Sequence, residues 1–299
     1  MKKGIASIAV LLTLSIAIQV VRDRRYTTPG DDLTSVLYVQ SPEAMRRVAL
    51  SFTALAADLD WIRAVQHYGG DHRTDIVIKR YELLYPLLDR TTTLDPRFNI
   101  AYRFGAIFLA EPQPLGAGRP DLAIKLLEKG IAATGRWEYY EDIGFVLYWQ
   151  LHDYKAAAEM FTRGAAAPNG PWWLKTMAAV MLARGGDRAT SRGLWRQILQ
   201  TADNDWLRSQ AELRLTQLDA MDQIDQLEAI VTRYRTTTGR LPDSWLALER
   251  AGYFRSNGPP ADPTGEPYQL NVETGRVTLS PASKLRPLPT EPPGAGARS

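Results

Sequence analysis

Cysteine is absent from the 299-residue chain. Its absence excludes disulfide bonds, thiolate metal sites and a lipidated N-terminal cysteine, and it is compatible with any cellular compartment. Histidine is almost as scarce, since the chain has only His67, His72 and His152. The first two flank an expected helix break, the third lies in a polar turn, and the HExxH zinc motif does not occur. We therefore expect no metal site among them.

An excess of charge of one sign is also lacking. The chain has 36 basic and 33 acidic residues, which give a net charge of +3 and are mixed along its length. Because phosphate backbones are bound by dense clusters of Lys and Arg, we expect no nucleic-acid partner. The G-x-S-x-G motif of hydrolases is missing, and Gly116 and Gly118 do not follow a strand as a nucleotide-binding loop requires. The sequence predicts a protein that is not an enzyme, with no catalytic residues, no metal and no cofactor.

The longest hydrophobic run extends from Ile5 to Val21, with lysines before it and arginines directly after it. Its 17 residues are intermediate between a signal-peptide core and a full membrane span. No small-x-small cleavage site closes the run, so we expect residues 1–25 to be an uncleaved membrane anchor, with a cleaved signal peptide as the alternative. Residues 26–42 are expected to be a linker. A short tail before a large domain is typical of export, which predicts a single-pass protein of the bacterial inner membrane with its soluble domain in the periplasm.

Small and bulky residues recur with a spacing of 34 residues in the middle of the chain. In each unit a small residue is followed four positions later by a bulky apolar one and seven positions later by a third, mostly small one. This spacing places all three on one helix face. The three sets are Ala123, Leu127 and Gly130; Ala157, Phe161 and Gly164; and Ser191, Trp195 and Ile198. A turn and a second amphipathic segment precede each set, so each unit is expected to be a helical hairpin.

The turns Leu151–Tyr154 (LHDY) and Gly185–Arg188 (GGDR), together with these spaced residues, resemble the tetratricopeptide repeat (TPR) family. The resemblance implies an all-α fold, a right-handed TPR-like α-solenoid of about four helical hairpins over residues 43–235. The first hairpin, over residues 43–95, is expected to break at Gly69-Gly70, with its second helix beginning near Thr74. The fourth hairpin, over residues 203–237, has a weaker motif.

Residues 236–280 differ in character and resemble the tail of bacterial pseudopilins, through the words TGRLP, GY and DPTGEPY. Period-two alternation about a Glu-Thr-Gly turn predicts a β-hairpin after a short helix, Asp243–Ala251, so a small α+β appendage is expected. The resemblance leaves calcium at Asp262 and Glu266 as one alternative, and a tight turn without a ligand as the other. Residues 281–299 contain five prolines and are expected to be disordered.

The order of anchor, repeats and hairpin resembles a family of membrane-anchored bacterial tetratricopeptide proteins, through Ala57–Ala64 (ADLDWIRA), Leu94–Phe98 (LDPRF) and the DPTGEPY segment. In tetratricopeptide arrays the first helix of each hairpin lines the concave face. The resemblance therefore implies partner-binding residues at Asn99, Tyr102, Glu138, Glu141, Tyr148, Trp173, Thr176 and Gln210.

These features predict a membrane-anchored adaptor that holds a protein or peptide partner in an envelope assembly for secretion, pilus formation or transport. Two other hypotheses stay open. In one, the C-terminal segment is a calcium-dependent or enzymatic module. In the other, the chain is a structural tether that acts by self-association as a homo-oligomer.

Overall fold

The computed structural model of the chain describes residues 13–18, 20–21, 41–73, 81–254 and 258–291. The described part is mostly helical, as expected for an all-α protein, with a two-stranded sheet near the C-terminus. The predicted anchor, residues 1–25, lies largely outside this part, although residues 13–18 and 20–21 are helical. In the part that is described, no helix is both long and apolar enough to cross a bilayer.

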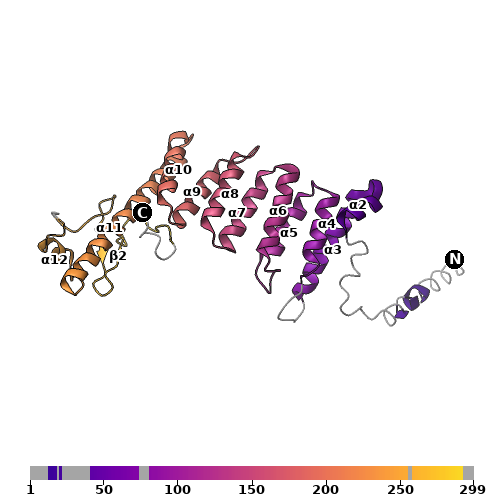
Figure 1. Cartoon of the computed structure of the whole chain (residues 1–299), viewed down its shortest axis with the longest axis horizontal. Coiled ribbons are helices and arrows are strands. Elements are labelled where there is room, and N and C mark those ends of the chain that lie inside the picture. Colours follow the sequence, from indigo (N-terminus) through magenta and orange to yellow (C-terminus); the bar gives the residue numbers. More distant parts are fainter. Residues whose placement is uncertain (1–12, 19, 22–40, 74–80, 255–257, 292–299) are drawn as a thin grey trace, which may run out of the picture.

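Helices follow one another closely along the chain, and each one from α3 to α10 packs against its successor. In Figure 1 these helices lie side by side in chain order and form an elongated row. Their bounds are α2 (Pro42–Ala49), η2 (Leu50–Phe52), α3 (Thr53–Arg73), α4 (Leu84–Leu94), α5 (Asn99–Ala110), α6 (Pro120–Thr134), α7 (Trp137–Trp149), α8 (Tyr154–Ala166), α9 (Trp173–Arg184), α10 (Arg188–Thr201), α11 (Asp205–Thr238) and α12 (Trp245–Arg250).

The turns before α8 and α10 each place an N-capping aspartate at the start of the helix. Asp153 accepts a hydrogen bond from the Ala156 amide at 2.9 Å, and Asp187 accepts one from the Thr190 amide at 3.0 Å. Each bond satisfies an amide that the first turn of a helix leaves without an intrahelical partner. Helices α8 and α10 therefore begin directly after the turns that the 34-residue spacing predicts.

The repeating small residues lie in the contacts between helices. Ala123, Ala157 and Ser191 are fully buried on α6, α8 and α10, and the bulky residues four positions later are buried with them. A Cβ atom at Gly144 of α7 would lie 2.6 Å from the Phe161 ring of α8. Small side chains at these contacts allow the helix axes to approach closely. The predicted helical packing of this stretch is confirmed.

The first hairpin differs from the prediction. Gly69 and Gly70 do not end a helix, because α3 continues through them to Arg73. Glycine costs a helix only about 1 kcal/mol relative to alanine, and packing of the Tyr68 ring on Phe108, with centroids 4.1 Å apart, holds this end of α3 against α5. The helix that packs on α3 is α4, which begins at Leu84, and an additional break that was not predicted falls at Leu50, whose φ of 48° separates α2 from α3. The start predicted near Thr74 lies outside the described residues.

The predicted fourth hairpin, over residues 203–237, is wrong. Helix α11 runs without interruption for 34 residues from Asp205 to Thr238 and ends at Gly239, whose φ is 75°. No glycine or proline occurs between these ends, so the segment has no residue that terminates a helix. One half of α11 packs on α10 through Leu207 and Ala211, and the other half supports the C-terminal unit.

The C-terminal unit contains the predicted short helix and β-hairpin. Strand β1 (Gln269–Leu270) pairs antiparallel with β2 (Val277–Thr278), and Trp245 of α12 donates from Nε1 to the Tyr268 carbonyl at 3.0 Å. Tyr268, Val277 and Leu279 are buried against α11. The small α+β appendage is thus present, and it lies on the second half of α11.

The structure differs from the expectation that residues 281–299 are disordered. Residues 281–291 follow a described path, on which Leu285 is only 1% exposed and packs with the α11 cluster. Ser283 donates from Oγ to Asp262, and Gln217 of α11 binds two carbonyls of the segment. A high proline content therefore does not by itself imply disorder, because the carbonyl groups of a proline-rich segment can still accept hydrogen bonds from side chains such as Gln217. Residues 292–299 lie outside the described part.

Candidate partner-binding surface

Side-chain contacts join α5 to α3 on one side and to α7 on the other. They leave one face of α5 uncovered. Phe108 of α5 stacks on Tyr68 of α3, and Arg103 of α5 binds Asp142 of α7 with an Nε to Oδ2 distance of 2.7 Å. These two contacts mark the sides of α5 that face its neighbours. Helical periodicity places Ile100, Phe104 and Ile107 between them, on a face that no described element covers.

Six apolar side chains make up the exposed part of this surface, which we call the apolar face. They belong to α3 and α5, and each is 49–57% exposed: Leu55, Leu59, Ile62, Ile100, Phe104 and Ile107. The Trp61 ring joins the two helices, since its centroid lies 6.0 Å from that of Phe98 and 6.3 Å from that of Phe108. Soluble monomers rarely leave such groups contiguous and uncovered, so the apolar face is a candidate contact surface.

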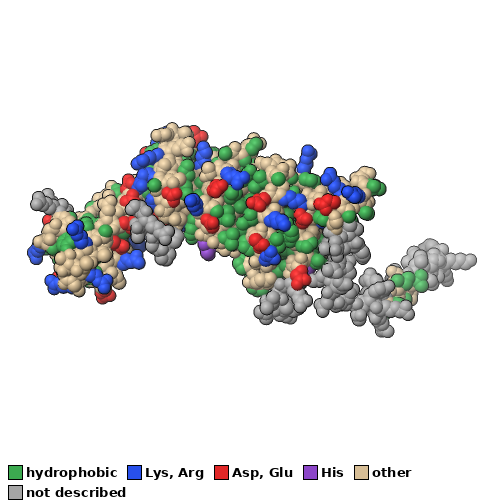
Figure 2. All heavy atoms as spheres, in the orientation of Figure 1, with side chains coloured by type: hydrophobic (Ala, Val, Ile, Leu, Met, Phe, Trp, Pro, Cys, Tyr) green, Lys and Arg blue, Asp and Glu red, His purple; other side chains and the backbone are tan. Residues whose placement is uncertain are grey.

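Aromatic and charged groups follow on α7. Trp149 is exposed and stacks on Phe145 with centroids 4.6 Å apart. Figure 2 shows hydrophobic side chains gathered over the region from α5 to α8, with Lys, Arg, Asp and Glu side chains among them. An apolar centre with charges around it is the composition that protein interfaces share.

The predicted residue Glu141 of α7 is bound to α5, together with its neighbour Asp142. Arg103 donates to both carboxylates, at 2.9 Å to Asp142 Oδ1 and at 3.4 Å to Glu141 Oε2. Burial raises the pKa of Asp142 above its usual range, although the Arg103 guanidinium lowers it. Burial and the neighbouring Asp142 also raise the pKa of Glu141. Glu138 pairs with Arg136 at the start of the same helix. Glu141 and Asp142 lie beside the apolar face and, through Arg103, hold α5 and α7 together.

Tyr148 and Trp173 of the predicted set join α7 to α9, and Thr176 bonds within α9. Tyr148 accepts a hydrogen bond from Arg184, whose guanidinium also lies 5.3 Å from the centroid of the tyrosine ring. Trp173 makes an edge contact with Trp137 at 6.0 Å, and Thr176 donates to the Trp173 carbonyl at 2.6 Å. All three predicted side chains are half-buried, with Tyr148 at the end of α9 that carries Arg184 and Trp173 at the beginning of that helix.

Tyr102 corrects the predicted set. Its side chain is fully buried, and its ring centroid lies 5.1 Å from that of Tyr139, so it belongs to the core and cannot touch a partner. The reason is the helix register, because Tyr102 points to the side of α5 opposite the apolar face. Asn99 is half-buried at the start of α5, and Gln210 is half-buried on α11.

The residues that sequence reasoning missed are Ile100, Phe104 and Ile107. A signal for them was present, because the α5 sequence NIAYRFGAIFLA is apolar on nearly all sides. A helix packed on one side needs only one apolar stripe, so its second stripe must be covered by something else or remain exposed. The partner-binding residues were assigned from their positions in the repeat motif, and that assignment did not take the second apolar stripe of α5 into account.

The turn around Asp262 satisfies the aspartate within the chain. Asp262 Oδ1 accepts from the Thr264 amide at 2.8 Å, the Thr264 hydroxyl at 2.7 Å and the Glu266 amide at 3.1 Å, while Oδ2 accepts from Ser283. Burial raises the pKa of Asp262, but these hydrogen bonds lower it by more, and the net shift is downward. The tight turn is therefore held by its own hydrogen bonds. Within the described ranges no three His, Asp or Glu side chains are grouped as a metal would require.

Comparisons of the chain with protein-family models, with curated proteins and with solved structures found no match.

Proposed function

We propose that the chain is a membrane-anchored adaptor in which a TPR-like α-solenoid binds a protein partner. The observation that carries this proposal is the apolar face of α3 and α5, where six large apolar side chains are each about half exposed. Covering what remains exposed would contribute roughly 1 kcal/mol for each side chain, which is enough to drive association.

The location and process are part of the same proposal. The hydrophobic run from Ile5 to Val21 supports attachment to the bacterial inner membrane, with the helical row in the periplasm. The partner is then a protein of an envelope assembly for secretion, pilus formation or transport. A partner helix or extended segment with apolar anchors matches the apolar face in chemistry.

Photo-crosslinking in membranes tests the proposal. A photoreactive phenylalanine analogue replaces Phe104 in the full chain, and a matched analogue replaces Glu128, an exposed residue on α6. We expect a specific protein adduct at position 104 that is at least tenfold weaker at position 128. Adducts consisting only of further copies of this chain would favour the self-associating tether instead, and the absence of any adduct would refute the adaptor.

A substitution supplies the second half of this test. Phe104→Glu places a charge on the apolar face. The side of α5 that packs in the core is unaltered, so the helical content should persist. Partner recovery should fall at least tenfold. Val272→Glu, at an exposed apolar position in the C-terminal unit, serves as the control and should leave recovery unchanged.

A further inference from the structure

The C-terminal segment 285–291 lies in a groove formed by α9, α10 and α11. Part of this groove is a cavity of about 300 Å³. Helices α9, α10 and α11 line the cavity through Val180, Ala183, Arg184, Trp195, Arg214 and Leu218. Residues 287–290 of the segment close it. The segment is thus held against three helices that precede it by many residues, in the manner of a bound peptide.

Gln217 of α11 recognises the backbone of this segment. Its Nε2 donates to the Leu285 carbonyl at 2.8 Å and to the Pro287 carbonyl at 3.0 Å, and the side chain is only 2% exposed. Arg214 donates to Gln217 Oε1 at 2.8 Å and so fixes the orientation of the amide. A segment rich in proline offers carbonyl acceptors but few amide donors, which is the pattern that a side-chain NH₂ group can satisfy.

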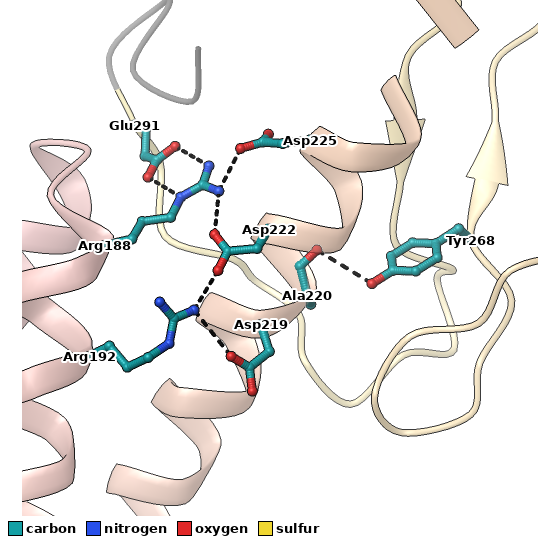
Figure 3. Close-up of polar contacts among 8 residues, drawn as sticks. All are labelled: Arg188, Arg192, Asp219, Ala220, Asp222, Asp225, Tyr268 and Glu291. Carbon is teal, nitrogen blue, oxygen red and sulfur yellow. Dashed lines mark hydrogen bonds and ion pairs between the residues drawn. The ribbon is translucent and has the colours of Figure 1, made fainter. Parts of the chain in front are cut away.

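Arg188 of α10 recognises the acidic end of the segment. Its Nε and Nη2 atoms donate to the two oxygens of Glu291 at 2.7 Å and 2.6 Å, in a two-pronged pair shown in Figure 3. Asp222 and Asp225 of α11 bind the remaining Nη1 atom at 2.9 Å and 2.6 Å. Such paired hydrogen bonds between arginine and carboxylate are geometrically selective. Glu291 is therefore placed by an arginine that α11 has already oriented.

The cavity also contains positive charge that no acid of the described residues neutralises. Arg184 and Arg214 both line it, and neither forms an ion pair with a carboxylate of the described residues. Because both cations line one cavity, the Arg184 charge adds to the effect of burial, and both lower the pKa of Arg214. An additional carboxylate in this groove would relieve their repulsion.

We propose that this groove is a peptide-binding site and that residues 285–291 are its built-in ligand. Its external partner is an extended peptide that contains proline and carries a carboxylate, and it binds by displacing the segment. The side-chain amide of Gln217 donates hydrogen bonds to carbonyl groups of the partner, and Arg188 binds one of its carboxylates. Arg184 and Arg214 together favour a second carboxylate. The site is separate from the apolar face, so it adds a second and self-occupied contact to the proposed adaptor.

Release of the segment is the first measurement. The lysine-specific protease Lys-C cuts after Lys284, which is exposed, and does not cut after arginine, so cleavage after Lys284 reports on release and the arginines introduced below add no cleavage site. In the full chain Glu291→Arg should accelerate this cleavage at least tenfold, because it opposes Arg188. The matched control Glu273→Arg, at an exposed position in the hairpin turn, should leave the rate unchanged. If Glu291→Arg and Leu288→Asp both leave the rate unchanged, the segment is not a displaceable ligand.

Binding in trans is the second measurement. A labelled synthetic peptide of residues 285–291 is titrated into the full chain and followed by fluorescence anisotropy. We expect at least tenfold tighter binding to Glu291→Arg than to the unaltered chain, and loss of that binding when Gln217→Leu is added. Binding no tighter than that of a scrambled peptide, in a variant with unaltered circular dichroism, would overturn the proposal.

The unaltered chain supplies a test that does not depend on the folding of a variant. Excess unlabelled peptide of residues 285–291 should accelerate cleavage after Lys284, and a scrambled peptide should not. No acceleration at saturating peptide would count against displacement. The variant Phe104→Glu should bind this peptide normally, so failure at the groove is distinguishable from failure at the apolar face.

Discussion

Asp60 of α3 and Arg90 of α4 form an ion pair in which neither side chain is more than 2% exposed. Arg90 Nε donates to Asp60 Oδ2 at 2.5 Å, and a second guanidinium nitrogen donates to Oδ1. Because the pair is removed from water, each charge gains stabilisation from the other that solvent does not supply. The pair therefore fixes α3 against α4 directly behind the apolar face.

Asp60→Ala tests this dependence. Removing Asp60 takes away the carboxylate that binds two nitrogens of the buried Arg90 guanidinium, so we expect a loss of about 3–5 kcal/mol in the free energy of unfolding. Urea titration followed by circular dichroism measures the loss. Arg63→Ala is the control, since Arg63 is 37% exposed and lies 3.6 Å from the same carboxylate. It should cost less than about 1 kcal/mol. Equal losses in the two variants would contradict the role given to burial.

The part of the fold that local patterns encode was predictable. Ala123, Ala157 and Ser191 pack helices at a spacing that repeats along the chain, and Asp153 and Asp187 cap the helices that follow them. These signals depend on residues within a few turns of one another. The sequence predicted α6, α8 and α10 for this reason, and their burial confirms it.

Contacts between distant residues were not predictable in the same way. Arg188 and Glu291 are 103 residues apart, and nothing near either one indicates the other. From the sequence, Gln217 would be assigned to the surface of a helix. It is buried because it donates to the carbonyls of Leu285 and Pro287, which are far away in the sequence. The error at Tyr102 has another cause, because a repeat motif gives the helix but not its rotation within the row.

Gly144→Ala tests the close approach of α7 and α8. The added Cβ would lie 2.6 Å from Cε1 and 2.8 Å from Cδ1 of the Phe161 ring, which is itself fully buried. Overpacking of this kind should cost about 1–3 kcal/mol, which outweighs the gain of up to about 1 kcal/mol from replacing a helical glycine. Urea titration of the full chain gives the difference.

Gly193→Ala is the matched control for that substitution. Gly193 also lies in a helix, α10, but a Cβ at this position would meet nothing within 4 Å. Only the change in helix propensity remains, so we expect a stabilisation of about 0.5–1 kcal/mol. Opposite signs for the two variants would support the packing argument, and a stabilisation by Gly144→Ala would refute it.

Acid should loosen the C-terminal unit through Asp262. Hydrogen bonds from Ser283, Thr264 and Glu266 outweigh burial and hold the pKa of this carboxyl below its usual range. A group with a depressed folded pKa contributes stability that is present above its unfolded pKa, about 3.9, and is lost as the pH falls through the folded pKa. Protonation of Asp262 also weakens the hydrogen bond that it accepts from Ser283. That hydrogen bond fixes the chain directly before the segment 285–291.

Pepsin, which is active in acid, provides the measurement. Cleavage within residues 258–291 should accelerate as the pH falls from about 4 toward 2, ahead of cleavage in α7 and α8. Asp262→Asn should accelerate cleavage at all these pH values and remove most of the pH dependence, because an amide keeps the shape but not the charge. Glu273→Gln, in the exposed hairpin turn, should follow the unaltered chain. A pH dependence that persists in Asp262→Asn would assign the acid sensitivity to another carboxyl group.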